Sequence, residues 1–281
     1  MKAIIKKNNQ VVLTNLKKPL LKDNHSIVKI SHVGICRTDL YVAKNLIKTK
    51  NNLILGHEAS GTVIESKNQH LLNQPVAINP FYDQGFMGLN FNGALAEYVL
   101  VPDQQLIVCK KIDSKYAAYL EPLAASMAVL KYKKQLKGRG AIYGNNRIAQ
   151  LTKIILNSYD INVDIIDENS KTIKTYDFII ETKFNTDSIN NILNLLKPNG
   201  ILIIKSRNID GALFNSSILV KKEISIFCVN YYDFLKTKKW LLKNHQKITH
   251  LLGDSYPLEK WQEAFKMSLL NFNHVWICCR I

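Results

Sequence analysis

The spacing of apolar side chains divides the chain into two parts. In the first part, short segments such as SIVKISHV at 26–33 alternate apolar and polar residues, and glycines and prolines separate these segments at short intervals. This pattern is typical of half-buried strands, and the frequent turns suggest a small barrel. From Ser114 onward, longer apolar stretches indicate helices over 115–119 and 124–132. We therefore expect a β-rich first domain and a second domain that begins near residue 123.

The second part opens with the pattern of a dinucleotide-binding unit. A strand is predicted at 139–143, a glycine turn follows it, and a helix over 148–157 leads to a strand at 163–167. In this arrangement the backbone N–H groups of the turn and the helix N-terminus meet a pyrophosphate, and an acid after the second strand meets the ribose. The predicted cofactor-binding residues are Gly144, Asn146, Arg147, Ile148 and Asp167.

The glycine pattern of this turn is incomplete. Asn146 stands where G-x-G-x-x-G has its second glycine, and Ala149 stands at the third, where a small residue is accepted. Asparagine tolerates positive φ better than most residues, but its side chain would crowd a diphosphate. We therefore expect weakened NAD binding, with an empty βαβ unit as the alternative. Asp167 would repel an added phosphate, so NAD is preferred to NADP.

The segment after Asp167 is short. Only residues 168–175 separate it from the next apolar run at 176–181, and eight residues cannot hold both a crossover helix and a further strand. Later strands are predicted at 201–204 and 224–229. The sequence therefore predicts a truncated, doubly wound parallel sheet of the Rossmann type.

Length and composition narrow the class of protein. The chain has 281 residues, which suits two domains, and its 47% apolar content is ample for a core. It has no uncharged apolar run of about 18 residues, and the start MKAIIKKNNQ has no apolar signal core. We therefore predict a cytoplasmic protein that does not interact with membranes.

The net charge of +16 raises the question of nucleic-acid binding. The lysines are dispersed in small groups, such as Lys6-Lys7 and Lys110-Lys111, and do not gather in one segment. We predict no nucleic-acid partner, although the positive field could steer an anionic substrate such as a sugar phosphate. The five cysteines include no C-x-x-C pair, which argues against a disulfide framework and against a zinc finger.

Four residues in three separate segments offer metal-ligand chemistry. They are Cys36, His57, Glu58 and Glu121. Thiolate, imidazole and carboxylate are the ligand types that zinc accepts, and a catalytic zinc keeps one position open. Taken alone, a His beside a Glu is more often a satisfied loop pair, so the three segments carry the prediction together.

These segments resemble the zinc-dependent medium-chain dehydrogenase/reductase family, particularly its polyol and threonine dehydrogenase branch. The motifs are G-I-C-x-T-D-L at 34–40, G-H-E-x-x-G at 56–61 and E-P-L-A at 121–124. The resemblance implies a GroES-like catalytic domain at 1–122, a dinucleotide-binding domain at 123–235, and a return segment at 236–281 that completes the catalytic domain. In comparison with the family, the second domain is expected to lack a helix and a strand.

The resemblance also assigns roles to individual residues. It implies Cys36, His57 and Glu58 as zinc ligands, with Glu121 as a fourth ligand or one that exchanges with water. Thr38 would belong to a proton relay, and Asp39 would orient the cysteine loop. The family usually carries a structural zinc held by four cysteines, but the corresponding interval 81–92 has none here. One catalytic zinc and no structural zinc are therefore expected.

The predicted activity is reversible hydride transfer between a secondary alcohol and NAD. The alcohol would be a polyol, sugar, sugar phosphate or amino alcohol, and the carbonyl compound would be the reverse substrate. One alternative is an enzyme of the same fold that has drifted to another reaction with weak dinucleotide binding. The other is a non-catalytic binding protein that keeps the fold. A homo-oligomer, dimer or tetramer, is expected.

Overall fold

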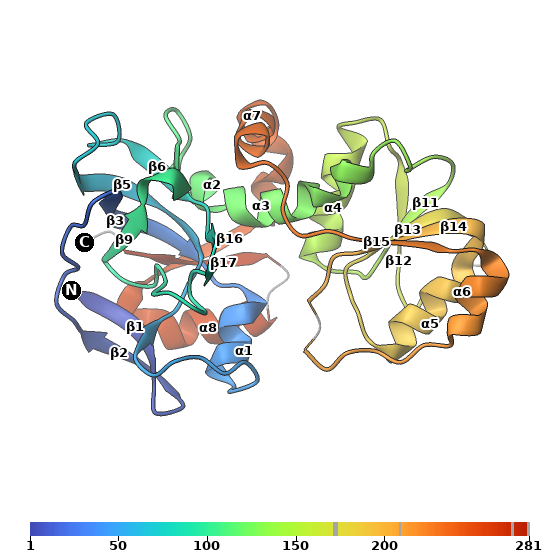
Figure 1. Ribbon diagram of the computed structural model, residues 1–281, viewed down its shortest axis with the longest axis horizontal. Helices are drawn as coiled ribbons and strands as arrows, with labels where there is room; N and C mark the ends of the chain where they lie inside the picture. Colours follow the sequence, from blue (N-terminus) through green and yellow to red (C-terminus); the bar gives the residue numbers. More distant parts are fainter. Residues whose placement is uncertain (171–173, 208, 271–272, 280–281) are drawn as a thin grey trace. The chain divides into compact units, whose positions relative to one another are not determined.

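The computed structural model describes residues 1–170, 174–207, 209–270 and 273–279, which form two compact units (Figure 1). The first unit is Met1–Pro122 together with Phe234–Ile281, and the second is Leu123–Asp233. The chain therefore leaves the first unit once and returns to it. The boundary falls within helix α3 (Leu120–Met127).

The first unit is built on a seven-stranded sheet. Its strand order is β10-β6-β5-β3-β17-β16, and β9 pairs with β3. The strands are β3 (His25–Gly34), β5 (Glu58–Ser66), β6 (Pro75–Ile78), β9 (Tyr98–Pro102), β10 (Leu106–Val108), β16 (Leu252–Pro257) and β17 (His274–Cys278). β17 from the returning segment is antiparallel to β3, so the end of the chain completes this sheet.

Smaller elements surround this sheet. A three-stranded sheet has the order β2-β1-β4, and β7 pairs with β8. The remaining strands are β1 (Lys2–Lys7), β2 (Gln10–Asn15), β4 (Leu53–Ile54), β7 (Phe81–Tyr82) and β8 (Gly85–Phe86). The helices are α1 (Arg37–Ala43), η1 (Asp103–Gln105), α2 (Ser114–Ala118), α7 (Phe234–Asn244), η3 (His245–Leu251), η4 (Leu258–Lys260) and α8 (Trp261–Leu270).

The core of the first unit joins residues from both of its chain segments. Val28, Ile30 and Val33 of β3 are almost fully buried in one cluster with Val275 and Ile277 of β17. Apolar residues of these two paired strands thus meet in one core, and the shift of the β3–β5 register between Ile30 and His32 interrupts the two-residue alternation before Val33. This packing makes β3 and its flanking strands a rigid base for the site.

The second unit is a five-stranded parallel sheet with the order β12-β11-β13-β14-β15. Its elements are η2 (Ala128–Tyr132), β11 (Gly140–Tyr143), α4 (Arg147–Asn157), β12 (Val163–Ile166), β13 (Tyr176–Glu181), α5 (Thr186–Leu195), β14 (Leu196–Ile204), α6 (Ser216–Lys222) and β15 (Ser225–Cys228). The order is that of a six-stranded Rossmann sheet without its third strand. The predicted truncated Rossmann-type sheet is confirmed, although residues 171–173 of the short connection lie outside the described residues.

Several sequence-based boundaries differ from the structure. The sequence predicts a turn at His57 and Glu58 with a strand at 61–65, but β5 already starts at Glu58. The sequence predicts a turn near Gly253, but the strand β16 covers this segment. The segment LGDSYP has no regular alternation of apolar and polar residues, and its pairing with β17 supplies the order that the local pattern does not.

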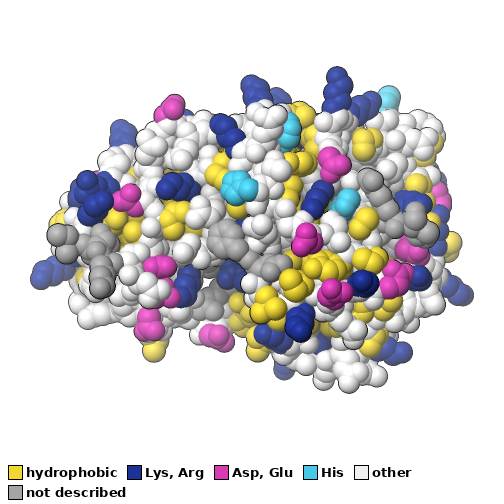
Figure 2. All heavy atoms as spheres, turned by 180° about the vertical axis from the view of Figure 1, so that it is seen from behind, with side chains coloured by type: hydrophobic (Ala, Val, Ile, Leu, Met, Phe, Trp, Pro, Cys, Tyr) yellow, Lys and Arg dark blue, Asp and Glu magenta, His cyan; other side chains and the backbone are white. Residues whose placement is uncertain are grey.

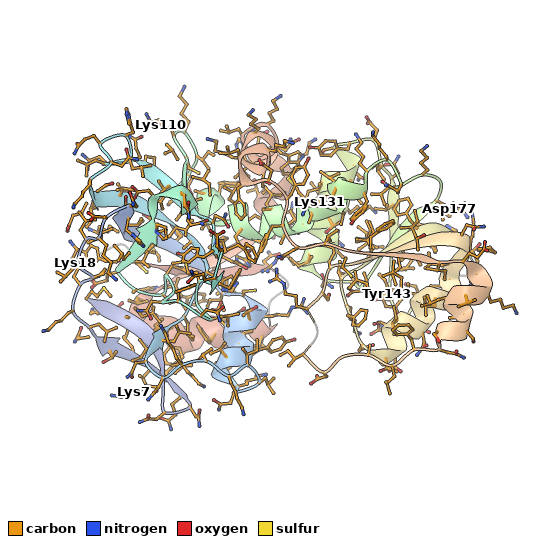
Figure 3. The ribbon with its side chains drawn as sticks, in the orientation of Figure 1. Lys7, Lys18, Lys110, Lys131, Tyr143 and Asp177 are labelled. Atoms are coloured by element: carbon orange, nitrogen blue, oxygen red, sulfur yellow. The ribbon has the colours of Figure 1, made fainter. Side chains whose placement is uncertain are left out.

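Charged side chains are spread over the surface. Lysines and arginines stand among acidic residues across the face in Figure 2, and Lys7, Lys18 and Lys110 point outward (Figure 3). This distribution agrees with the dispersed lysines of the sequence. In the part of the chain that the structure describes, no helix has both the length and the hydropathy of a membrane span.

Candidate metal and dinucleotide sites

The cysteine motif forms the junction between β3 and α1. Cys36 is half-buried at the N-cap position of α1, with extended backbone angles. Its backbone N–H donates to Oδ2 of Asp39 at 3.0 Å, and the N–H of Gly56 donates to Oδ1 of the same carboxylate at 3.0 Å. Asp39 is 1% exposed. A single buried carboxylate therefore ties the cysteine segment to the segment that carries His57.

The two glycines of G-H-E-x-x-G have separate structural causes. Gly56 has φ of +89°, a left-handed conformation that disfavours other residues, and a Cβ there would lie 2.9 Å from the backbone N of Leu95. A Cβ on Gly61 would lie 2.2 Å from the backbone O of Lys29 on the neighbouring strand. Both glycines therefore let the backbone pack closely around His57 and Glu58.

The structure brings three of the four predicted metal ligands together. Ligand atoms of Cys36, His57 and Glu58 all lie within 4.8 Å of one another. His57 and Glu58 are 2% and 1% exposed. This buried set of one sulfur, one imidazole and one carboxylate fits zinc in donor chemistry and in number, because a catalytic zinc takes about three protein ligands. The residues present therefore fit the metal.

Glu121, the fourth predicted ligand, is not part of this group of three. It lies in the first turn of α3 and is 5% exposed. Its charge nevertheless reaches the site, since it is one of the groups that raise the pKa of His57. Its role as an exchanging ligand stays a prediction.

Opposing effects act on the pKa values of the site. Burial opposes protonation of His57, but the nearby acidic groups of Asp39, Cys36 and Glu121 outweigh it and raise the His57 pKa well above its usual value. Burial is also the largest influence on Asp39 and raises the pKa of that carboxyl. In the absence of a cation, the site concentrates acidic groups that a divalent ion would stabilise.

The predicted relay residue lies beside the sulfur. Thr38 is half-buried in α1, and its Oγ1 lies 3.8 Å from Sγ of Cys36. The hydroxyl can donate and accept hydrogen bonds at once. The structure therefore places this hydroxyl beside a predicted metal ligand.

The glycine turn of the second unit joins β11 to α4. Gly144 has φ of +120°, and its N–H donates to the carbonyl of Ile166 at the end of β12. Asn146 is the N-cap of α4, and Arg147 opens the helix. Ile148 follows in the first turn. The structure thus places the predicted pyrophosphate-binding residues at one helix N-terminus, and Asp167 follows directly after the strand that Gly144 contacts.

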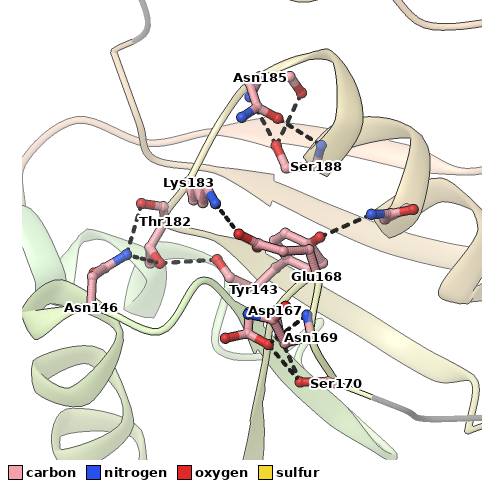
Figure 4. Close-up of polar contacts among 11 residues, drawn as sticks. Tyr143, Asn146, Asp167, Glu168, Asn169, Ser170, Thr182, Lys183, Asn185 and Ser188 are labelled. Atoms are coloured by element: carbon pink, nitrogen blue, oxygen red, sulfur yellow. Dashed lines mark hydrogen bonds and ion pairs between the residues drawn. The ribbon is translucent and has the colours of Figure 1, made fainter.

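Asn146 has a different role from the one expected. Its φ is −146°, so tolerance of positive φ does not explain its presence and that interpretation is wrong. Its Oδ1 accepts from the N–H of Ala149, while its Nδ2 donates to the carbonyl and hydroxyl oxygens of Thr182 at 3.2 and 3.0 Å (Figure 4). Asparagine is a preferred N-cap residue. The side chain therefore caps α4 and ties the turn to the end of β13.

The acidic end of β12 is also structured. Oδ1 of Asp167 accepts hydrogen bonds from the N–H of Asn169 and the hydroxyl of Ser170, both at 3.0 Å. The neighbouring Glu168 forms an ion pair with Lys183, the second residue after β13 (Figure 4). Asp167 is half-exposed, and these two hydrogen bonds hold its carboxylate in place.

Sequence reasoning missed one residue of the first unit. His274 is the first residue of β17, is fully buried, and has Nε2 2.5 Å from Oε2 of Glu58. It stands 216 positions after Glu58 and belongs to no recognisable motif. Only the pairing of distant strands reveals it.

Comparison with known proteins agrees with this architecture. Residues 22–111 match the alcohol dehydrogenase GroES-like domain. The chain is 29% identical over 210 residues to an NAD-dependent alcohol dehydrogenase of Sulfolobus acidocaldarius. These residues cover 61% of this chain and 60% of that protein. It is also 22% identical to the D-arabitol-phosphate dehydrogenase of Enterococcus avium, over 92% of this chain and 90% of that protein.

A solved structure extends the likeness to the whole fold. An alcohol dehydrogenase from Escherichia coli, complexed with NADH, superposes with a TM-score of 0.89 at 18% identity and covers 99% of both chains. A GroES-like domain joined to a dinucleotide-type parallel sheet defines the class of alcohol dehydrogenase-like oxidoreductases. By its GroES-like domain and its fold, the chain resembles the medium-chain dehydrogenase/reductase family.

Proposed function

We propose that this protein is a zinc- and NAD-dependent dehydrogenase that reversibly oxidises a secondary alcohol. The observation that carries the proposal is the convergence of Cys36, His57 and Glu58 within 4.8 Å in a buried place. The named activities of the relatives, an alcohol dehydrogenase and a polyol-phosphate dehydrogenase, support this substrate class. A polyol, sugar, sugar phosphate or amino alcohol is the proposed substrate.

Cys36, His57 and Glu58 would hold the zinc, with Glu121 as the exchanging ligand. When bound, the metal supplies Lewis-acid polarisation of the substrate oxygen. Asp39 holds the two ligand segments together through the N–H groups of Cys36 and Gly56. It has a positioning role and takes no part in proton transfer.

Thr38 is proposed to carry the proton that the alcohol releases. Its Oγ1 accepts the hydroxyl proton while its own proton passes outward, so the residue ends the step unchanged. The Thr38 contact with Cys36 at 3.8 Å supports this role, since it keeps the hydroxyl at the cluster. The residue at the outer end of the relay is not assigned, because Tyr41 occupies the position where the family often has histidine.

Residues 123–235 are proposed as the dinucleotide-binding domain, and 1–122 with 236–281 as the catalytic domain. Backbone N–H groups of Gly144, Asn146, Arg147 and Ile148 would bind the pyrophosphate, and Asp167 would bind the adenosine ribose and favour NAD over NADP. When bound, the nicotinamide supplies the hydride acceptor. A protein that depends on this cofactor pool is proposed to work in the cytoplasm.

A homodimer is the proposed assembly. β15 is at the end of the strand order of the second unit, and Ile226 on it is 37% exposed. Val220 on the preceding helix α6 is 78% exposed. An exposed apolar edge strand favours pairing with a second copy, which would cover both residues.

The test is an alcohol panel assayed with zinc-loaded protein and NAD⁺, with formation of NADH followed by absorbance. Oxidation of one or more secondary polyols, lost in a Cys36→Ser variant at equal folding, supports the proposal. NAD(H) binding without turnover of any alcohol would favour a drifted enzyme of the same fold. Absence of both binding and turnover would favour a non-catalytic protein.

A further inference from the structure

His274 lies against Glu58 in the interior of the first unit. Nε2 of His274 is 2.5 Å from Oε2 of Glu58, and the two side chains are 0% and 2% exposed. β17, which carries His274, and β5, which begins with Glu58, are both neighbours of β3 (Figure 1). Strand pairing therefore brings a residue near the C-terminus to a proposed metal ligand.

The space between these side chains depends on Gly34. Gly34 is opposite Glu58 in the β3–β5 pair and opposite Trp276 in the β3–β17 pair. A Cβ on Gly34 would lie 2.2 Å from Oε2 of Glu58 and 2.2 Å from Nε2 of His274. The Glu58 carboxylate and the His274 imidazole therefore occupy the space that a side chain at position 34 would need.

Two aromatic side chains hold the imidazole in its orientation. The His274 ring has an edge contact with Trp276 at 4.4 Å between centroids and another with Tyr119 at 5.5 Å. Trp276 and Tyr119 are themselves fully buried. Because the ring is packed between them, Nε2 stays directed at Glu58, and the imidazole can restrict the carboxylate.

We infer that His274 is a positioning residue that holds the Glu58 carboxylate in the orientation required to bind the metal. The inference rests on the metal site of the proposed function. A glutamate side chain has several rotatable bonds, and each must be restrained before its oxygen can bind a metal tightly. Partners that hold a ligand in place typically change metal affinity by about 10- to 100-fold when they are removed.

The experiment compares His274→Gln with His274→Asn. The amide nitrogen of glutamine can reach the position of Nε2, whereas that of asparagine stays nearer to the backbone and cannot reach Glu58. Each variant is made in the wild type and in a Glu58→Ala background. The affinity for Zn²⁺ is measured by competition with a chelator, and Co²⁺ absorption reports the ligand geometry. Thermal unfolding of the metal-free proteins serves as the control for folding.

We expect His274→Asn to weaken Zn²⁺ binding by about 10- to 100-fold and His274→Gln to change it by about three-fold or less. In the Glu58→Ala background, the Gln and Asn variants should bind Zn²⁺ equally, since the carboxylate that they would position is gone. Equal affinities of Gln and Asn in the wild-type background, or the same difference in both backgrounds, would overturn the inference. A loss of thermal stability without a change in Zn²⁺ affinity would do so as well, because it indicates a purely structural residue.

These outcomes are separable from the test of the proposed function. If Zn²⁺ affinity depends on His274 only when Glu58 is present, but the protein oxidises no alcohol, the proposed activity is contradicted and the role of His274 is left intact. If the protein oxidises an alcohol but its Zn²⁺ affinity shows no such dependence, the proposed activity is supported and the role of His274 is contradicted. If the wild type binds no Zn²⁺ at all, His274 cannot position a metal ligand and the inference is wrong.

Discussion

Oδ1 of Asp39 lies 3.7 Å from Nδ1 of His57, and both side chains are almost fully buried. The same carboxylate accepts the N–H groups of Cys36 and Gly56. Asp39 is therefore connected to both segments that carry proposed metal ligands. Asp39 therefore stabilises the site in two ways, through hydrogen bonds from the backbone and through its negative charge beside the His57 imidazole.

Asp39→Asn should lower the free energy of unfolding by about 2 kcal/mol, because hydrogen bonds to a charged acceptor are lost and an amide N–H₂ must face a backbone donor. Zinc binding should weaken as the ligand segments lose their connection. Chemical denaturation and chelator competition measure the two effects. Asp83→Asn, an exposed loop position with the same change of charge, is the control, and an equal effect there would contradict a specific role of Asp39.

Zinc analysis should give one zinc per chain after loading. Cys36→Ala combined with His57→Ala should abolish the metal, because two of three proposed ligands are removed. Cys228→Ala is the matched control, since Cys228 is an exposed cysteine and its loss should leave the content at one. Two zinc ions in the wild type, or retention of zinc by the double variant, would show that the ligand assignment is wrong.

Thr38→Val should keep the fold and the zinc content, because valine preserves volume and β-branching. The hydroxyl would be absent, and turnover should fall by about 10²-fold, the lower end of the range for general acid–base steps. Thr38→Ser should restore most of the activity. Steady-state kinetics with any alcohol that the wild type oxidises provide the measurement. Full activity of Thr38→Val at normal zinc occupancy would remove Thr38 from the proton path.

Asn146→Gly should tighten NAD(H) binding, because the amide beside Gly144 is removed. A Cβ on Gly144 would lie 3.0 Å from Nδ2 of Asn146, which shows how closely this side chain approaches the turn. The variant should also lose about 1 kcal/mol of stability, since the side-chain cap of α4 and the bonds to Thr182 disappear.

Asn146→Ser is the comparison for that variant, because serine can still cap the helix with a smaller side chain. Calorimetry measures the affinity, and thermal unfolding measures the stability. We expect Asn146→Ser to bind more tightly than the wild type with a smaller loss of stability than Asn146→Gly. Weaker binding by both variants would mean that the Asn146 amide contributes to the cofactor site.

Asp177→Asn should destabilise the protein in a manner that depends on pH. Asp177 Oδ1 and Oδ2 both accept from Lys197 Nζ at 2.9 Å, and Oδ2 accepts the N–H of Arg139 at 2.7 Å. The Lys197 ammonium, followed by the Arg139 N–H, lowers the pKa of the Asp177 carboxyl below its usual value.

A depressed carboxyl pKa stabilises the fold above the unfolded pKa, and this stability is lost as pH falls through the folded value. The free energy of unfolding of the wild type should therefore exceed that of Asp177→Asn by less than about 1 kcal/mol near neutral pH, since the ion pair with Lys197 is partly exposed. The difference should shrink below pH of about 4. Denaturation at several pH values measures it, and a difference that does not change with pH would contradict the ionic origin.

The features that local sequence determines were predictable before the structure. The turn at Gly144 and the segments around Cys36 and His57 consist of neighbouring residues whose conformation depends on their own side chains. The short interval 168–175 also predicted the missing strand, because chain length alone limits what eight residues can form. Local chemistry and chain length thus indicated the family resemblance, the β-rich first domain and the truncated parallel sheet of the second domain.

Only the tertiary structure decided how distant segments meet. Gly34 pairs with Glu58 on one side and with Trp276 on the other, and this register brings His274 to the Glu58 carboxylate. The apolar and polar pattern of the sequence does not predict such a pairing. It specifies which face of the sheet a residue occupies but not which strand lies beside it. The hydrogen bond from Asn146 Nδ2 to Thr182 is similar, since Thr182 directly follows β13, another strand of the sheet. The sequence by itself determined the local chemistry of this protein, and the long-range pairing of β3 with β5 and β17 decided which of these side chains act together.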